Sequence, residues 1–441
     1  MKTEKKSLVA RLLSGGLWGI ISKFSAIGSN LVIASLLAKQ LSFSDVALFF
    51  AFASLVAFFS QFAQMGVHQI VVKDTARAVG LKKSFYDIFI HYFVLIVFGV
   101  LIASVLMALV MHFFLHINVI SNYFYLIFAC VWCCLAAMQI YMNAVMKGVK
   151  KFREAALYGE AFSAVVILLL VIFQSFVLPK QLAVVLALVC FAYLLNIICA
   201  RRFLNKLAGR DKNALVESGG KLLKDLFKES YPVWVSSCLI MLMSHAGIWL
   251  AGYFDGEQGL AYFGLAHRIS MLCIVPDMVV ASFIGPFVVD FYAKNELMKL
   301  QNILANIALC AFLPSLGLFL IFCFFDVEII TVFFSEEYLP AGELILLLAF
   351  AKVFSVFTGA CGVVLLMTGH QKEILKSSWF SIGFMLVISM LLGESRGSWG
   401  VAVGVLVGTV LQNSYQLYIV KEKVGVLPVA RLAGFRSLLG K

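Results

Sequence analysis

The sequence has few charged residues and few prolines. Only 13% of its 441 residues are charged, whereas soluble domains have about 25%. Its 7 Pro residues are too few for a collagen-like or Pro-rich disordered chain, and it contains no P-loop for ATP. By contrast, 62% of the residues are hydrophobic, and 41 residues are Phe. This composition excludes a soluble globule and predicts a protein whose main solvent is a lipid bilayer.

Long apolar runs predict twelve membrane-spanning helices. A helix needs roughly 20 residues to cross a hydrocarbon core of about 30 Å, and these runs are longer and more continuously apolar than the alternating strands of a membrane barrel. We therefore expect an all-α, polytopic membrane protein. The predicted spans cover residues 14–38, 46–68, 88–114, 122–146, 156–178, 181–200, 232–253, 260–289, 303–325, 341–367, 374–393 and 398–419.

Positive charge lies almost entirely on one side of these spans. Cytoplasmic loops retain Lys and Arg, and 29 of these residues fall on the side of the two termini, against three on the other side: Lys39, Lys180 and Arg396. Both termini are therefore predicted to be cytoplasmic. The formal net charge of +12 is explained by this topology, and no nucleic-acid partner is expected.

The longest polar stretch, residues 201–231, follows the sixth span and divides the chain into equal sets of spans. We predict an amino-terminal six-helix lobe (1–205), a basic cytoplasmic linker (206–231) and a carboxy-terminal six-helix lobe (232–441), with a central cavity between the lobes. Because each half has an even number of spans, both have the same orientation. Gly400, Gly404 and Gly408 follow small-xxx-small spacing, which predicts a helix-packing seam in span twelve.

Four ionisable residues lie well inside predicted spans: Lys23 in span one, Arg268 and Asp277 in span eight, and Lys352 in span ten. Such residues are costly in lipid and usually face protein or a water-filled cavity. The excess of cations suggests that Lys23, Arg268 and Lys352 bind an anionic substrate, since the Arg fork suits phosphate.

A structural role for the same charges is the alternative. Lys23 and Lys352 can snorkel, or can pair with Asp277 or Glu160. Asp277, Glu160, His245 and His267 are also candidate accessory or coupling residues. Pro276 is expected to kink span eight. No cofactor is expected. No metal site is expected either, because Cys130 and Cys133 form a C-x2-C that lacks a second ligand pair.

Several segments carry a resemblance to a known family. They are Gly16-Leu17-Trp18-Gly19 in span one, Leu260-Ala261-Tyr262-Phe263-Gly264-Leu265-Ala266-His267-Arg268 in span eight, Phe334-Ser335-Glu336-Glu337-Tyr338, and Leu365-Leu366-Met367-Thr368-Gly369-His370. With twelve spans in two lobes, nearly the whole chain resembles the Wzx-type O-antigen and polysaccharide flippases of the multidrug/oligosaccharidyl-lipid/polysaccharide (MOP) exporter superfamily.

This resemblance implies a function. Such flippases move undecaprenyl-pyrophosphate-linked oligosaccharides by alternating access from the cytoplasmic to the periplasmic leaflet of the bacterial inner membrane, in lipopolysaccharide and other surface polysaccharide biosynthesis. It also implies contact with membrane lipids and with the polysaccharide polymerase and chain-length machinery. Related lipid II flippases carry cavity cations in spans one and eight, the spans of Lys23 and Arg268, although this chain has Lys where those relatives have Arg.

Two other function classes stay open at this point. One is a cation-coupled multidrug exporter of the same fold, which would more often carry an acidic cation site in its amino-terminal lobe, where this chain has Lys23 and Glu160. The other is a membrane-embedded polysaccharide polymerase or glycosyltransferase. Such an enzyme needs paired catalytic carboxylates outside the hydrocarbon, and the short outer loops contain no convincing pair, so we expect a protein that is not an enzyme.

Overall fold

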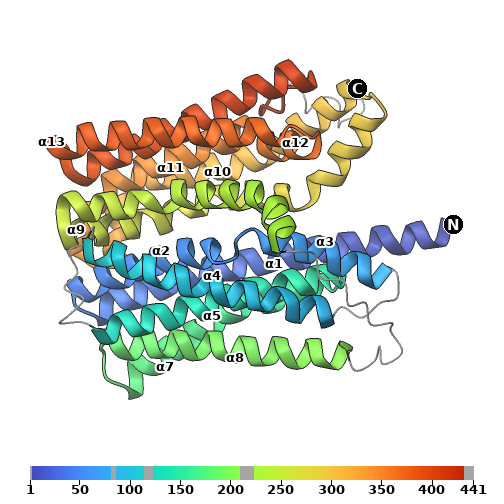
Figure 1. Cartoon of the computed structure of the whole chain (residues 1–441). Helices are drawn as coiled ribbons and strands as arrows, with labels where there is room; N and C mark the ends of the chain where they lie inside the picture. The colour runs from blue at the N-terminus through green and yellow to red at the C-terminus, as the bar shows by residue number, and fades with distance from the viewer. Residues whose placement is uncertain (1, 81–85, 114–122, 209–222, 432–441) are drawn as a thin grey trace. The chain divides into compact units, whose positions relative to one another are not determined.

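The structure, a computed structural model, describes residues 2–80, 86–113, 123–208 and 223–431. Within these ranges every regular element is a helix (Figure 1). The elements are α1 (Lys2–Gln40), α2 (Phe43–Phe62), α3 (Val67–Gly80), α4 (Tyr86–Phe113), α5 (Tyr123–Gly148), α6 (Phe152–Ala156), the π-helix η1 (Leu157–Ala161), α7 (Phe162–Val177), α8 (Leu182–Ala208), α9 (Leu223–Ala293), α10 (Leu297–Phe333), the 3-10 helix η2 (Glu336–Tyr338), α11 (Ala341–Thr358), α12 (Cys361–Met367), α13 (Gln371–Ile419) and the π-helix η3 (Val420–Val424).

The twelve predicted spans are confirmed, although two pairs of them form single helical elements. Ten helical segments of the described chain are long and apolar enough to cross a membrane. Two of these, Val233–Ala281 in α9 and Gln371–Val424 in α13 and η3, are 49 and 54 residues long. Each contains a glycine with non-helical backbone angles, Gly256 (φ 61°) and Gly397 (φ 55°). Positive φ is easily adopted only by glycine, and at each of these residues the helix ends and a second span begins.

The two arms of α13 form an antiparallel hairpin with very close backbones. A Cβ atom on Gly400 would lie 2.8 Å from the backbone nitrogen of Gly393, and one on Gly408 would lie 2.8 Å from Cβ of Met385. Because the partner residue number falls as the glycine number rises, the arms run in opposite directions. The small-xxx-small spacing of Gly400, Gly404 and Gly408 is therefore confirmed as a packing seam.

The arms of α9 meet in the same way on either side of Gly256. A Cβ atom on Gly259 would collide with the carbonyl of Ala251, and one on Gly247 would lie 2.6 Å from the Phe263 ring. These pairs again run in opposite directions along the chain. The second span of α9, which holds Arg268, is thus positioned directly by the first.

Asp255, next to the turn of α9, joins this hairpin to the turn of α13. Its Oδ2 accepts hydrogen bonds of 2.5 Å from both the backbone nitrogen and Oγ of Ser398. Both bonds are charge-assisted, the stronger class of hydrogen bond.

We expect Asp255→Asn to lower the free energy of unfolding by about 1–3 kcal/mol, because it removes the charge from both bonds to Ser398. Unfolding in mixed detergent micelles measures the difference. Asp290→Asn is a matched control, since Asp290 pairs with Lys294 at 2.8 Å where both side chains are more than half exposed, and exposed pairs contribute little. A stability of Asp255→Asn equal to that of the control would contradict the proposed clamp.

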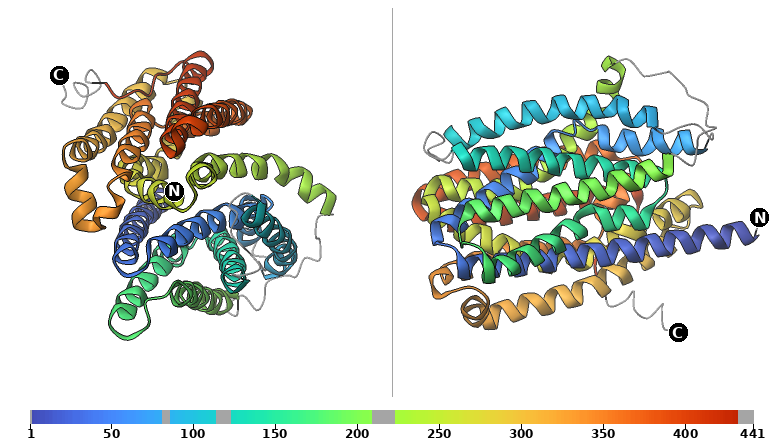
Figure 2. Two further views of the ribbon diagram at one scale, coloured as in Figure 1. Left: turned by 90° about the vertical axis from the view of Figure 1, so that its left-hand side faces the viewer. Right: turned by 90° about the horizontal axis from the view of Figure 1, so that it is seen from below.

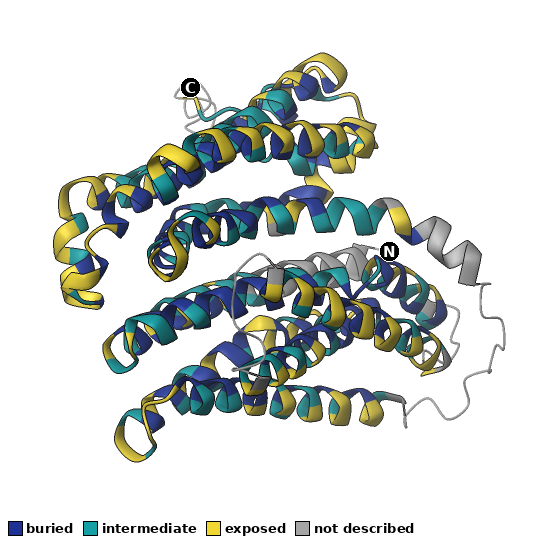
Figure 3. Ribbon diagram, turned by 60° about the vertical axis from the view of Figure 1, so that its left-hand side comes forward, coloured by how far each residue is buried: buried dark blue, intermediate teal, exposed yellow. Residues whose placement is uncertain are grey.

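Exposed apolar side chains form stripes along the helices, as expected of a protein surrounded by lipid. On α4 the exposed residues Val94, Phe98, Leu101, Val105 and Leu109 recur every three or four positions, so they share one helix face. Buried and exposed residues alternate along the helices in this manner (Figure 3). Such stripes would be a liability in water and are the lipid-facing surface of a membrane protein.

The chain divides into two compact units, Met1–His245 and Ala246–Lys441. In the first unit, α1 packs beside α7, and α5 packs beside both α2 and α8 (Figures 1 and 2). In the second, α11 packs beside α10 and α13. The predicted lobes end at 205 and begin at 232, and much of the linker between them lies outside the described residues, so that domain assignment stays a prediction.

Span ten is broken, whereas the sequence predicts one continuous helix over 341–367. Gly359 has φ 75° and separates α11 from α12. The carbonyl of Phe357 near this break accepts a hydrogen bond of 3.1 Å from the backbone nitrogen of Ala430. The chain after η3 is held nearby, because Leu427 N donates to Oε1 of Gln301 at 3.0 Å. In span eight, by contrast, α9 runs through Pro276 without interruption.

Candidate functional site: an intramembrane charge cluster at a broken helix

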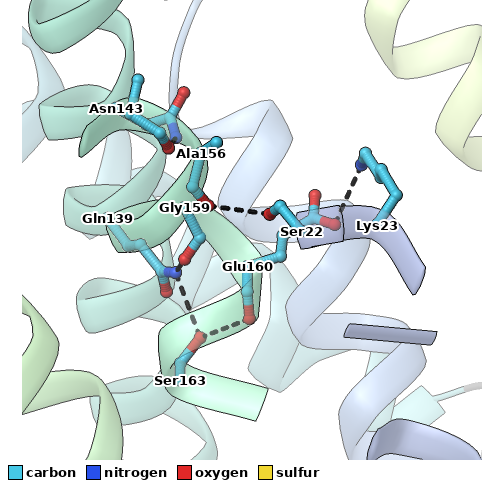
Figure 4. Close-up of polar contacts among 9 residues, drawn as sticks. Ser22, Lys23, Gln139, Asn143, Ala156, Gly159, Glu160 and Ser163 are labelled. Carbon is cyan, nitrogen blue, oxygen red and sulfur yellow. Dashed lines mark hydrogen bonds and ion pairs between the residues drawn. The ribbon is translucent and has the colours of Figure 1, made fainter. Parts of the chain in front are cut away.

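Lys23 and Glu160 form an ion pair within the spans of the first unit. Lys23 lies in α1, near the start of the apolar segment Trp18–Gln40. Its Nζ donates a hydrogen bond of 2.9 Å to Oε2 of Glu160 (Figure 4). The side chains are 40% and 67% exposed, and charges that face hydrocarbon are costly. Side chains with this exposure are therefore expected to face water rather than hydrocarbon. Two roles were considered for Lys23, binding an anionic substrate and pairing with an acidic residue. The structure shows a contact of the second kind, with Glu160.

Glu160 belongs to a break in the fifth span. This span begins at Phe152, four residues before the predicted start, and α6 gives way to the π-helix η1 before α7. Within η1, Gly159 has φ −72° and ψ −122°, outside the helical region. Helix breaks in a membrane release backbone carbonyls that must find other donors, and in transporters they often mark binding sites.

Amide side chains of neighbouring helices supply those donors (Figure 4). From α5, Nδ2 of Asn143 donates to the carbonyl of Ala155 at 2.5 Å, and Nε2 of Gln139 donates to the carbonyl of Gly159. From α8, Nδ2 of Asn196 donates to the same Gly159 carbonyl at 3.3 Å. The break is thus fixed by specific polar contacts. Gln139 and Asn143 lie four residues apart on one helix face, a sequence signal that could have identified them.

A separate contact joins α1 to the break. Oγ of Ser22 donates to the carbonyl of Ala156 at 2.7 Å, and Ser22 precedes Lys23 in the chain. The two helices are therefore held together at this point by a hydrogen bond that does not involve the charged side chains.

We expect Gln139→Leu to lower the free energy of unfolding by about 1–3 kcal/mol, the cost of leaving a buried polar group without its partner. Gln139 is buried and also donates to Oγ of Ser163 at 3.1 Å. Unfolding in mixed micelles is the measurement. Gln371→Leu is the control, because Gln371 is the exposed first residue of α13. Equal stability of the two variants would show that the break does not depend on Gln139.

Lys147 adds a second positive charge to the pair. It lies in the last turn of α5, is exposed, and interacts electrostatically with both Lys23 and Glu160. The cluster thus holds two cations and one carboxylate and is positive overall. From the sequence, Lys147 belongs to the cytoplasmic loop charges, and nothing in its spacing distinguishes it from them. An ammonium group in contact with the carboxylate and a second one that interacts with it electrostatically are suited to attracting an anion by charge.

Arg268 lies in the second arm of α9, in the other unit. Its side chain is half-buried, and Nη1 donates to the carbonyl of Gly264, one turn earlier, at 3.3 Å. An Arg guanidinium has five N–H donors in a planar fork, so a bidentate contact with a phosphate is chemically available to it. Arg268 is the group in this unit best suited to recognising such an anion.

Asp277 and Lys352 are half-buried in α9 and α11. Within the described residues neither forms a hydrogen bond or an ion pair, so the structure does not show the predicted alternative in which Lys352 pairs with Asp277. The carboxylate of Asp277 interacts electrostatically with the Cys361 thiol. His245 and His267, in α9, are also half-buried, and the carbonyl of His267 accepts a hydrogen bond of 2.9 Å from Oγ of Ser270. Roles for these four residues stay predictions.

The fold of the chain resembles that of solved membrane transporters. One solved structure similar to it is the inward-facing conformation of a multidrug resistance MATE family transporter, at 16% identity, covering 91% of this chain and 94% of that one, with a TM-score of 0.71. A MOP superfamily transporter from Pyrococcus furiosus, described as having reverse polarity of its binding pocket, is similar at 16% identity and a TM-score of 0.67, over 95% and 96% of the two chains.

The chain belongs to the polysaccharide biosynthesis protein family, whose model matches residues 12–289. The MatE model also matches, over residues 232–391. A curated relative is the probable low-salt glycan biosynthesis flippase Agl15 of Haloferax volcanii, 24% identical over 235 residues, which are 50% of each protein. The chain thus spans about half the length of the curated relative it matches. The resemblance to polysaccharide flippases of the MOP superfamily is confirmed.

Proposed function

We propose that this protein translocates undecaprenyl-pyrophosphate-linked oligosaccharides, such as O-antigen repeat units, from the cytoplasmic to the periplasmic leaflet of a bacterial inner membrane. The observation that carries the proposal is the excess of cations within the spans of a polysaccharide biosynthesis family member: Lys23 and Lys147 around one carboxylate, and Arg268 and Lys352 in the second unit. A lipid diphosphate is the anion that such a family member would be expected to carry.

The roles of the cations follow from their chemistry. Arg268 binds a phosphate through its planar fork, while Lys23, Lys147 and Lys352 act as point charges. Alternating access then exposes these residues to one leaflet at a time. Moving a negative charge outward across an inside-negative membrane gains about 2.3 kcal/mol per charge per 100 mV, so the membrane potential favours export of a diphosphate.

The decisive experiment is deletion of the gene in its host, followed by labelling of the lipid-linked oligosaccharide with an impermeant reagent at the outer face. We expect labelling to fall while the total amount of lipid-linked sugar is maintained or rises. Restoring the gene must restore labelling. Undiminished labelling in a host without a second carrier would exclude this function, and a covalently altered lipid-linked product would instead indicate a membrane enzyme.

A cation-coupled multidrug exporter is the second candidate, supported by the fold shared with multidrug resistance transporters. It predicts altered drug resistance on deletion and unchanged surface glycan. The positive charge balance of the intramembrane residues favours an anionic cargo over the cationic compounds that such a coupled site would exchange.

A further inference from the structure

We propose that Glu160 is a displaceable counter-ion. In the protein without substrate its carboxylate neutralises part of the Lys23 and Lys147 charge, and a diphosphate takes its place when substrate binds. The inference rests on the proposed function, because it assigns the diphosphate of the carried lipid to this cluster. It makes Glu160 a competitor of the substrate for Lys23.

The exposure of the ion pair indicates a contact that can be broken. Glu160 is 67% exposed and Lys23 40% exposed, and pairs with such access to water contribute little net stability. The Lys23 ammonium is the hydrogen-bond donor that the structure gives for the Glu160 carboxylate. A salt bridge built to hold two helices together is more often enclosed, with its remaining lone pairs satisfied.

The helices do not need the ion pair in order to stay together. Ser22 donates to the carbonyl of Ala156 at 2.7 Å. Ser22 is the residue before Lys23, and Ala156 lies four residues before Glu160. The carbonyl of Gly159, next to Glu160, is held by donors from Gln139 and Asn196. The backbone on both sides of the pair is therefore fixed independently, and Glu160 can release Lys23 without loss of the surrounding structure.

The number of charges indicates which anion fits. Glu160 supplies one negative charge to a cluster with two ammonium groups, and Lys147 interacts with both members of the pair. A diphosphate carries at least two negative charges, so it can replace the carboxylate at Lys23 and also interact electrostatically with Lys147, which compensates for displacing Glu160. A singly charged ligand would exchange one partner of Lys23 for another with no net gain. The site thus favours a diphosphate over a carboxylate or a phosphodiester.

The test measures binding of farnesyl diphosphate, a short prenyl diphosphate, to the purified full chain in detergent. We expect Glu160→Gln to bind it about five- to tenfold more tightly than the wild type, because the competing carboxylate is removed, with little change in thermal stability. The gain should be smaller for farnesyl monophosphate and absent for farnesol. Lys23→Met should weaken binding. Asp290→Asn is the matched control, because it removes a carboxylate from an exposed pair with Lys294 and should leave the affinity unchanged.

The outcomes separate this inference from the proposed function. If the wild type binds farnesyl diphosphate and Glu160→Gln binds it equally or more weakly, Glu160 positions Lys23 and the counter-ion role is wrong, while the proposed function stands. If the wild type binds neither farnesyl diphosphate nor the monophosphate, the proposed substrate class is wrong, and this inference with it. Glu160→Ala serves the same comparison if Glu160→Gln does not fold.

Discussion

Arg268→Ala is expected to slow translocation of the lipid-linked oligosaccharide about 100-fold while the protein still inserts and folds. A bidentate guanidinium–phosphate contact contains two charge-assisted hydrogen bonds, each worth about 1.5–3 kcal/mol, and every 1.4 kcal/mol corresponds to a factor of ten. Arg268→Lys keeps the charge but loses the fork, so we expect an intermediate loss of about tenfold. The rate at which labelled substrate appears at the outer face of proteoliposomes measures both.

Arg396→Ala is the control for this experiment. Arg396 lies next to the turn of α13, and its guanidinium stacks on the ring of Trp399 at 4.9 Å from the ring centroid. Arg396→Ala removes one positive charge, as Arg268→Ala does. It should leave the translocation rate within about twofold of the wild-type rate, since a cation–π contact of this kind is worth only about 0.5–1 kcal/mol when exposed. Normal translocation by abundant Arg268→Ala protein would remove Arg268 from the mechanism.

The second large effect is expected at the seam of α13. A Cβ atom on Gly404 would lie 2.8 Å from the backbone nitrogen of Ser389 and 2.9 Å from the carbonyl of Met385, and would collide with Oγ of Ser389. Backbone atoms cannot move aside as a flexible side chain can. Gly404→Val must therefore separate the two arms and unpack spans eleven and twelve. We expect a loss of at least about 3 kcal/mol, at the upper end of overpacking costs, or no folded protein.

Gly383 provides the matched control on the same element. It lies in the first arm of α13, is exposed, and has nothing within 4 Å of the position that a Cβ would take. Gly383→Ala should therefore raise stability by about 0.5–1 kcal/mol, because alanine is the better helix former. Thermal unfolding in detergent, together with the yield of monodisperse protein, compares the two variants. A Gly404→Val protein as stable as Gly383→Ala would mean that the arms do not pack as described.

The number and direction of the spans could be predicted because each depends on local sequence. A run of about 20 apolar residues is long enough to cross the membrane wherever it occurs, and the distribution of Lys and Arg orients the whole chain. The seam at Gly400, Gly404 and Gly408 was similarly predictable, because small residues every four positions create a flat helix face. The exact limits of span five and the break in span ten were not, since both depend on partners far away in the chain.

The candidate site shows the same division. Lys23, Glu160 and Arg268 stand out in the sequence because charged residues are costly inside a span. The contact between Lys23 and Glu160 joins residues 137 positions apart, and no local pattern encodes it. Gly159 lies between Tyr158 and Glu160, and this local sequence does not predict that the helix opens there. Its carbonyl depends on donors from α5 and α8, so the break follows from tertiary packing.

The contact between Ala430 and Phe357 has a consequence for biosynthesis. Span ten is interrupted at Gly359, and the carbonyl of Phe357 takes its hydrogen bond from a residue more than seventy positions later in the chain. A ribosome releases residue 430 only after spans eleven and twelve have been made. Until then this carbonyl must accept a hydrogen bond from water or from the insertion machinery, because hydrocarbon offers no donor. Span ten can therefore reach its final form only after residue 430 has been translated.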